Sequence, residues 1–113
     1  MEDCIFCKIA AGEIGQLIYE DEQSAAFHDV NPQAPVHILV VPKEHIERLD
    51  QTNESHKMIL GHLLIVANRV AKEKGIADNG YRVVLNNGVS AGQSVWHIHV
   101  HVLGGRDMRW PPG

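Results

Sequence analysis

The chain has 113 residues, so we expect a single domain across residues 1–113 with one modest hydrophobic core. The hydrophobic fraction of 44% and the charged fraction of 21% are typical of a folded globular protein and argue against a disordered chain. A net charge of −4 argues against bulk electrostatic binding to nucleic acid or to an anionic membrane, although a small anionic ligand needs only local donors.

The N-terminal segment MEDCIFCKIA carries acidic residues where a secretory signal needs basic ones, and no apolar run approaches the roughly 18 residues of a transmembrane helix. We therefore expect a cytoplasmic protein. Cys4 and Cys7 form one C-x-x-C pair, which in a reducing compartment favours a metal or redox element over a structural disulfide. Residues 4–11 predict a short helix that Asp3 caps and that ends at Gly12.

Three strands are expected next along the chain. LIYE (17–20) and SAAFHDV (24–30) predict a strand pair joined by a turn at DEQ. NPQAP (31–35) predicts a stiff loop, because its two prolines fix φ. VHILVVP (36–42) is a nearly continuous β-branched apolar run, which is typical of a strand at the centre of a sheet.

The second half of the chain combines a long helix with two more strands. Apolar residues three or four positions apart predict a helix from about Glu54 to Lys74, ended by Gly75. YRVVLN (81–86) predicts a strand, and a strand with three histidines follows a loop. Because the strand connections are short enough for antiparallel pairing, the order predicts an α+β fold: one short and one long helix on a mainly antiparallel sheet of about five strands.

The segment WHIHVHVLGG (96–105) places a histidine on every second residue. On a strand, His97, His99 and His101 project to one face, and the alternate apolar residues pack against the helix. The simplest interpretation is a solvent-facing strand surface whose polar residues happen to be histidines. Three histidines at a strict period of two argue against that interpretation. Two chemistries stay open: a shared zinc ion, and attack on phosphorus by a neutral imidazole.

The loop before this strand, NNGVSAGQS (86–94), is rich in glycine, asparagine and serine. Such a loop can direct backbone N–H groups and hydroxyls at an anion. It matches neither the Walker pattern nor G-x-G-x-x-G, so its signal is weak in isolation. Beside three imidazoles, it predicts a phosphate-binding loop.

HIHVHVL (97–103) matches the signature H-φ-H-φ-H-φ-φ, and the chain resembles the Hint branch of the histidine triad (HIT) superfamily of nucleotide hydrolases and transferases. FHDVNPQAPVHILVVPKEHI (27–46), GQSVWHIHVHVLGGRDM (92–108) and the terminal WPPG (110–113) carry the likeness. It implies a single HIT domain and a homodimer with a continuous sheet. It also implies hydrolysis of purine nucleoside 5′-phosphoramidates (AMP- or GMP-amines) through a covalent nucleotidyl-histidine, with no cofactor required for catalysis.

The resemblance assigns the catalytic roles residue by residue. His99 matches the nucleophile, and His101 matches the residue that contacts the phosphate and supports departure of the amine. His37 matches a fourth histidine that orients the others, and Ser94 lies near the leaving group in relatives.

The same resemblance assigns the nucleotide contacts. Asp29 matches the acid that binds the ribose hydroxyls, as suits an acceptor with two oxygens. The ribose-phosphate loop corresponds to Asn86, Gly92, Gln93 and Ser94, beside His99 and His101. The slot for the purine corresponds to Ile5, Phe6, Ile9, Phe27 and Val30, for which an ordinary core role is the alternative.

The cysteine pair departs from the animal members of this branch. Some bacterial relatives carry it and bind zinc with two cysteines and two histidines. On that pattern the ligands are Cys4, Cys7, His45 and His97, in a structural site that ties the N-terminal helix to the sheet and removes His97 from acid–base chemistry. A redox pair and two small buried residues are the alternatives.

Several alternatives stay open. A dinucleoside polyphosphate hydrolase is the other enzyme of the superfamily, and a nucleotide- or zinc-binding regulatory module is the non-enzymatic reading. His28, His56 and His62 receive no chemical role, and His28 is expected to face away from Asp29. The tail RDMRWPPG reaches towards the partner's active site in relatives, or docks on its own domain.

Overall fold

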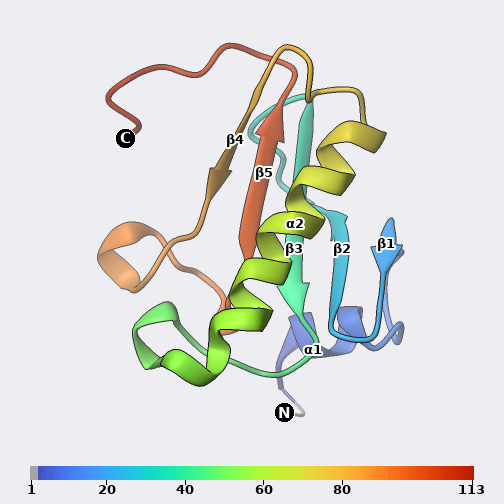
Figure 1. Ribbon diagram of the computed structural model, residues 1–113, viewed down its shortest axis with the longest axis vertical. Helices are drawn as coiled ribbons and strands as arrows, with labels where there is room; N and C mark the ends of the chain where they lie inside the picture. The colour runs from blue at the N-terminus through green and yellow to red at the C-terminus, as the bar shows by residue number, and fades with distance from the viewer. Residues whose placement is uncertain (1–2) are drawn as a thin grey trace.

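The computed structural model describes residues 3–113 and is built on one antiparallel sheet (Figure 1). Its spatial order is β1-β2-β3-β5-β4, and every neighbouring pair is antiparallel. The α+β prediction with about five strands is confirmed. The strands are β1 (Tyr19–Glu20), β2 (Ser24–His28), β3 (Val36–Pro42), β4 (Tyr81–Val84) and β5 (Val100–Gly104).

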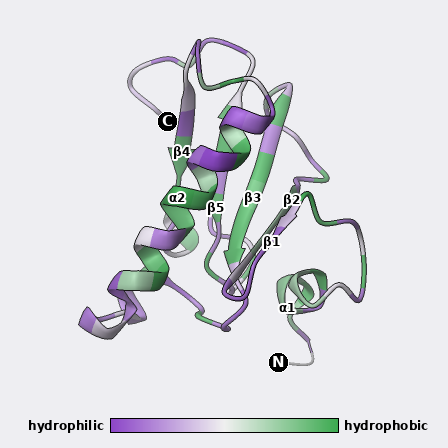
Figure 2. Cartoon of the chain, turned by 45° about the vertical axis from the view of Figure 1, so that its right-hand side comes forward, coloured by the Kyte–Doolittle hydropathy of each residue, from purple (hydrophilic) through white to green (hydrophobic). Residues whose placement is uncertain are grey.

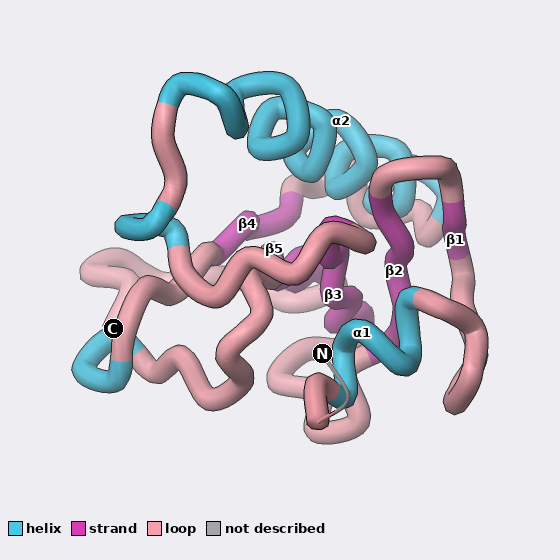
Figure 3. The backbone as a smooth tube through the Cα atoms, turned by 90° about the horizontal axis from the view of Figure 1, so that it is seen from below, coloured by secondary structure: helices cyan, strands magenta, loops and turns pink. Residues whose placement is uncertain are grey.

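Two α-helices lie on opposite faces of this sheet, as the view along the sheet shows (Figure 3). The long helix α2 (Lys57–Glu73) covers one face, and the short helix α1 (Ile5–Ala10) lies against the other. Three 3₁₀ turns complete the described chain: Leu49–Gln51, Glu54–His56 and Val89–Ala91. The motif residues His97 and His99 lie on the α1 side of the sheet, where both rings meet Phe6 of α1.

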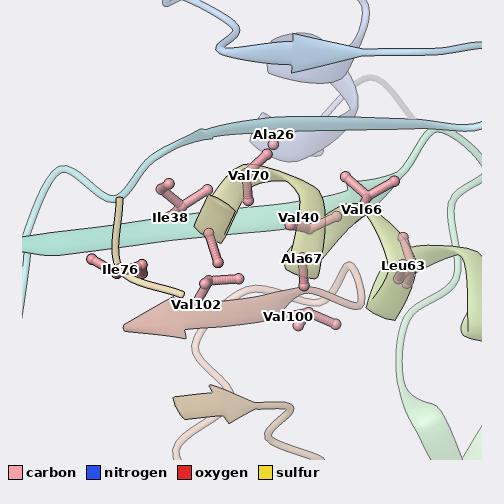
Figure 4. Packing of buried hydrophobic residues seen from close by; sticks show 11 residues of the cluster. Ala26, Ile38, Val40, Leu63, Val66, Ala67, Val70, Ile76, Val100 and Val102 are labelled. Carbon is pink, nitrogen blue, oxygen red and sulfur yellow. The ribbon is translucent and has the colours of Figure 1, made fainter. Parts of the chain in front are cut away.

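The main core forms because the predicted apolar stripe of α2 meets alternate residues of β3 and β5. Leu63, Val66, Ala67, Val70 and Ala71 are buried in one cluster with the inward residues of the strands. Figure 4 shows these side chains interdigitating, and Figure 2 shows hydrophobic and hydrophilic stretches alternating along α2. The strand residues of the cluster are Ala26, Ile38, Val40, Val100 and Val102.

The predicted helix over 54–74 is one turn shorter than expected, because Glu54–His56 is a 3₁₀ turn and α2 begins at Lys57. Gly75 follows the helix with φ of +76°, a conformation that favours glycine and ends the helix as predicted. None of the described helices is long and apolar enough to cross a membrane.

Two sequence expectations are wrong at the ends of elements. The cap of α1 is Cys4, whose sulfur accepts the Cys7 backbone N–H at 3.3 Å, rather than Asp3. The histidine strand begins at Val100, so His97 and His99 precede β5 and lie outside the strand ladder. The ladder stops there because Pro42 has no N–H to donate and its carbonyl accepts a bond from the His97 ring at 2.8 Å.

The C-terminal tail lies beside β4, at the edge of the sheet (Figure 1). The Arg82 guanidinium donates to the Arg109 carbonyl at 2.9 Å and lies 5.8 Å from the centre of the Trp110 ring. Trp110 itself is exposed. Within this chain, then, the tail docks on its own domain.

Candidate functional site

A cavity of about 530 Å³ opens between α1, the end of β2 and the segment that leads into β5. We call it the histidine cavity, because His99 and His101 line one of its walls. Asp29 and Ser94 supply its other predicted polar groups. All five residues of the predicted purine slot also line it, namely Ile5, Phe6, Ile9, Phe27 and Val30.

The slot residues differ in a way that separates binding from simple core packing. Phe6 and Phe27 are buried and meet edge to face, with ring centres 5.4 Å apart. Ile5 is 49% exposed and Val30 is fully exposed, so these two are not core residues. An apolar floor with exposed apolar rims is the shape that accepts a flat, largely apolar ring.

His99 lies at the junction of this slot and the polar wall. Its Nδ1 is 2.8 Å from the His97 carbonyl, which can only accept, so the ring proton lies on Nδ1. Nε2 therefore keeps its lone pair. Burial lowers the pKa of the His99 imidazole, which favours the neutral ring. His99 is therefore a neutral imidazole whose Nε2 can act as a base or a nucleophile.

His101 presents the opposite kind of atom, and the reason begins at a backbone amide. The Gln33 N–H donates to His37 Nδ1 at 3.0 Å, which leaves the His37 proton on Nε2. That Nε2 lies 2.9 Å from His101 Nδ1, which must therefore accept. The remaining proton of a neutral His101 lies on its own Nε2. Burial, with His99 and His37 nearby, lowers the pKa of His101 to about 4.

Asp29 closes this group of polar side chains. Its Oδ1 accepts the Asn31 backbone N–H at 2.8 Å, and its Oδ2 lies 3.4 Å from His37 Nε2. The first contact is a local turn that fixes the carboxylate where β2 ends. Because β2 ends at His28, strand alternation ends there too. His28, the last residue of β2, also lines the cavity.

The predicted phosphate loop divides into residues that face the cavity and residues that hold the loop. Ser94 is exposed and lines the cavity, whereas Asn86 and Gly92 do not line it. The buried Gln93 side chain accepts the Gly88 N–H at 2.9 Å and donates to the Glu47 carbonyl at 2.7 Å. Gln93 therefore acts as an internal brace for the loop.

Sequence reasoning missed some of the lining residues. Leu39 lies two positions after His37 on β3, so strand alternation alone could have placed it on the same face. Val95 adjoins Ser94, and Gly15 and Gln16 belong to an irregular segment after α1 that carries no periodic signal.

The predicted metal ligands converge on the other side of Phe6. The ligand atoms of Cys4, Cys7, His45 and His97 all lie within 4.8 Å of one another. Cys4 Sγ is 3.3 Å from His97 Nδ1, and Cys7 Sγ is 3.4 Å from His45 Nδ1 and 3.5 Å from His97 Nδ1. The His97 Nε2–H donates to the Pro42 carbonyl, which leaves the Nδ1 lone pair directed at the sulfurs.

These distances fit a tetrahedral zinc ion. Bonds of about 2.3 Å to sulfur and about 2.0 Å to nitrogen, at a tetrahedral angle, put neighbouring sulfur and nitrogen atoms about 3.5 Å apart. Two thiols and two imidazoles are also a donor set that zinc prefers. The two cysteines form no disulfide. Burial raises the pKa of the Cys7 thiol, helped by the adjacent Cys4, so without a cation the thiol form is favoured.

Comparison with known proteins gives a consistent result. The chain is 56% identical over 112 residues to a 14 kDa zinc-binding protein of Zea mays, covering 96% of this chain and 87% of that protein. A HIT family hydrolase from Legionella pneumophila superposes with a TM-score of 0.95 at 46% identity, covering 98% and 100% of the two chains.

A zinc-bound histidine triad family protein from Mycobacterium smegmatis superposes with a TM-score of 0.77 at 32% identity, covering 94% of this chain and 77% of that one. The family model described as HIT domain matches residues 13–108, which include the central strands, the loop and all three histidines of the motif. The chain therefore belongs to the HIT domain family.

Proposed function

We propose that this protein is a nucleotide-binding hydrolase of the Hint type, which cleaves the P–N bond of purine nucleoside 5′-phosphoramidates. One observation carries the proposal: an unprotonated nitrogen on His99 and a protonated nitrogen on His101 line one wall of a cavity with an apolar slot. A nucleophile and a hydrogen-bond donor at that spot suit attack on a phosphorus whose nucleoside lies in the slot.

The proposed reaction has two steps. His99 Nε2 forms a bond to phosphorus while the P–N bond breaks; the departing nitrogen accepts a hydrogen bond from His101 Nε2–H and takes its proton from solvent water. A water molecule then attacks the phosphorus, gives its proton to solvent, and releases the mononucleotide and free His99. The hydrogen bond from His37 to His101 Nδ1 keeps the His101 proton on Nε2, where it can donate to the departing nitrogen.

The nucleoside is held by groups of different chemistry at its two ends. The purine lies between the aromatic floor and the exposed aliphatic rim of the slot, and the ribose hydroxyls donate to the Asp29 carboxylate. Both contacts are available to adenosine and guanosine, so we propose both as substrates.

We further propose that the Cys4, Cys7, His45 and His97 site holds a structural zinc ion. The fit of the sulfur–nitrogen distances supports this, as does the name of the Zea mays relative. Zinc bound there supplies a cross-link between α1 and the segment before β5. In the sequence, Phe6 lies between Cys4 and Cys7, and its ring packs against the rings of His97 and His99. The zinc cross-link therefore also supports the floor of the slot.

Assembly into a homodimer is part of the proposal. The outer face of α2 exposes Met58 (81%) and Ile65 (67%), and β4 is an open edge of the sheet. Exposed apolar residues on a helix and an edge strand with one unpaired side both favour a second copy of the chain as partner. Sedimentation of the wild type and of Ile65→Glu measures this, and a wild-type monomer at micromolar concentration contradicts it.

A rate comparison tests the activity. AMP-amine and GMP-amine substrates and diadenosine tetraphosphate are offered to the protein under the same conditions. We expect both phosphoramidates to be hydrolysed faster than the polyphosphate, and His99→Ala to abolish turnover while AMP still binds. Faster cleavage of the polyphosphate overturns the choice of reaction.

A further inference from the structure

A second cavity, of about 450 Å³, adjoins the histidine cavity. Ile5, Ser94 and Val95 line both, so these three residues form a shared wall. We call the second one the side cavity. Asp3, Glu47 and Trp96 line it and do not line the histidine cavity, and its remaining lining residues are the metal-site residues Cys4 and His45.

The side cavity lies where the part of a substrate beyond the phosphate has to go. The slot holds the nucleoside at one end of the histidine cavity, and His99 and His101 define the position of the phosphorus. Ser94 borders both cavities, so a group that leaves the phosphorus past Ser94 enters the side cavity. No other described residue with a side-chain hydroxyl lies on the shared wall.

Hydrogen bonds from Gln93 fix the position of the shared wall relative to the segment that carries Glu47. The amide nitrogen of Gln93 donates to the Glu47 carbonyl at 2.7 Å and to the Val95 carbonyl at 3.1 Å. One buried side chain thus joins the segment that carries Glu47 to the segment that carries Ser94 and Val95. The side cavity is therefore part of the same framework as the phosphate loop.

The charge of the side cavity is negative. Asp3 and Glu47 contribute two carboxylates, and within residues 3–113 no lysine or arginine lines it. The nearby Arg48 lies over the Trp96 ring, 5.6 Å from its centre, but its guanidinium is paired with Asp50 at 2.7 Å. A zinc ion with two thiolates adds no net charge at Cys4 and His45. The exposed Trp96 and Ile5 give an apolar surface beside the carboxylates.

We propose that the side cavity receives the leaving amine and selects amines that carry a second positive charge on an aliphatic chain. The proposal rests on the proposed P–N cleavage and names its substrate class. The same carboxylates repel an anionic leaving group, such as an amino acid joined through its amine or the nucleotide released from a dinucleoside polyphosphate. This repulsion supports the proposed preference for a phosphoramidate over a dinucleoside polyphosphate.

Three AMP derivatives with the same three-carbon spacer test this selection. They join AMP to 1,3-diaminopropane (cationic), to butylamine (neutral) and to 4-aminobutyrate (anionic). We expect kcat/KM to fall in that order. Because both carboxylates are exposed, removing either one lowers the cationic-to-neutral ratio by about twofold to fivefold, and added salt lowers it too.

Matched variants separate the cavity from general surface charge. Glu47→Gln and Asp3→Asn are each expected to lower the cationic-to-neutral ratio by about twofold to fivefold, and the double variant is expected to abolish the preference. Glu44→Gln removes an exposed carboxylate that does not line the cavity and is expected to keep it. A preference that is absent, or that survives in the Asp3→Asn, Glu47→Gln double variant, overturns the proposal.

Binding to His99→Ala distinguishes this proposal from the proposed reaction. The dissociation constants of the three intact derivatives are measured by calorimetry in that variant, with and without Glu47→Gln. A cationic preference that depends on Glu47 supports the side cavity even if the wild type cleaves none of the three, which would overturn the reaction alone. Equal affinities overturn the side cavity whatever the rates are.

Discussion

Replacing His37 with phenylalanine removes one hydrogen bond from beneath the proposed phosphate site. His37 is buried, and its Nε2–H donates to His101 Nδ1 at 2.9 Å. Phenylalanine fills most of the same volume but cannot donate. Without that donor, the proton of the His101 ring is free to lie on Nδ1, and the departing amine then loses the hydrogen-bond donor that faces it.

The strength of one such hydrogen bond sets the expected size of the effect. A hydrogen bond to a charged group contributes about 1.5–3 kcal/mol, which corresponds to roughly 10- to 150-fold in kcat. His37→Gln keeps an N–H donor and is expected to retain more activity than His37→Phe. Both changes alter the acceptor of the Gln33 N–H, so thermal unfolding of each variant is measured alongside the rates.

Comparing two leaving groups tests whether His37 acts through His101. An AMP ester of p-nitrophenol releases an anion that needs no proton, whereas an AMP-alkylamine needs one. We expect His37→Phe to slow the amine substrate by the full factor and the ester by much less. Equal losses on both substrates would refute the proposed chain from His37 to the leaving amine and leave His37 with a purely structural role.

Three further predictions concern stability and metal. Burial alone raises the pKa of Asp21, but hydrogen bonds from Gln23, His62, Tyr19 and Ser24 outweigh it and hold the pKa well below its ordinary 3.8. The carboxylate therefore stabilises the fold above about pH 4, and urea unfolding should show Asp21→Asn costing about 1–3 kcal/mol at pH 7 and less as the pH falls below 4. Protein purified without added zinc should contain about one zinc per chain and Cys4→Ser much less, and a metal-free wild type would contradict the site. A Cβ at Gly104 lies 2.6 Å from Ile76 Cδ1, so Gly104→Ala should destabilise by about 1–3 kcal/mol, whereas Gly61→Ala, with nothing within 4 Å, should not; equal unfolding midpoints would contradict this.

Local patterns predicted most of the fold. VHILVVP is a strand over the predicted residues, and the stripe from Leu63 to Ala71 forms the buried face of α2. Both follow from side-chain periodicity, which depends only on neighbours in the sequence. The early end of the histidine strand could not be predicted in this way. It depends on the Pro42 carbonyl, 55 residues away, accepting the His97 ring.

The candidate site was predicted in its members but not in its proton positions. The motif and the resemblance indicated His37, His99 and His101. Which nitrogen of each ring carries the proton depends on the backbone amide of Gln33 and the carbonyl of His97. The cap of α1 is a similar case. Asp3 has the stronger intrinsic preference, yet Cys4 is fixed by its contact with His97.

The side cavity had no sequence signal, because its walls come from the start of the chain, the segment after β3 and the loop before β5. No periodic pattern connects such segments, and only the folded arrangement brings Asp3 and Glu47 to one space.

The most direct test of the central claim is to find the covalent intermediate. The protein is mixed with an AMP-amine, quenched within milliseconds and digested, and the peptides that contain the histidine motif are analysed by mass spectrometry. We predict an adenylyl group on His99 that appears during turnover, disappears when substrate is exhausted and is absent from His99→Ala. Steady hydrolysis with no adenylylated His99, or an adenylyl group on another residue, would contradict the claim.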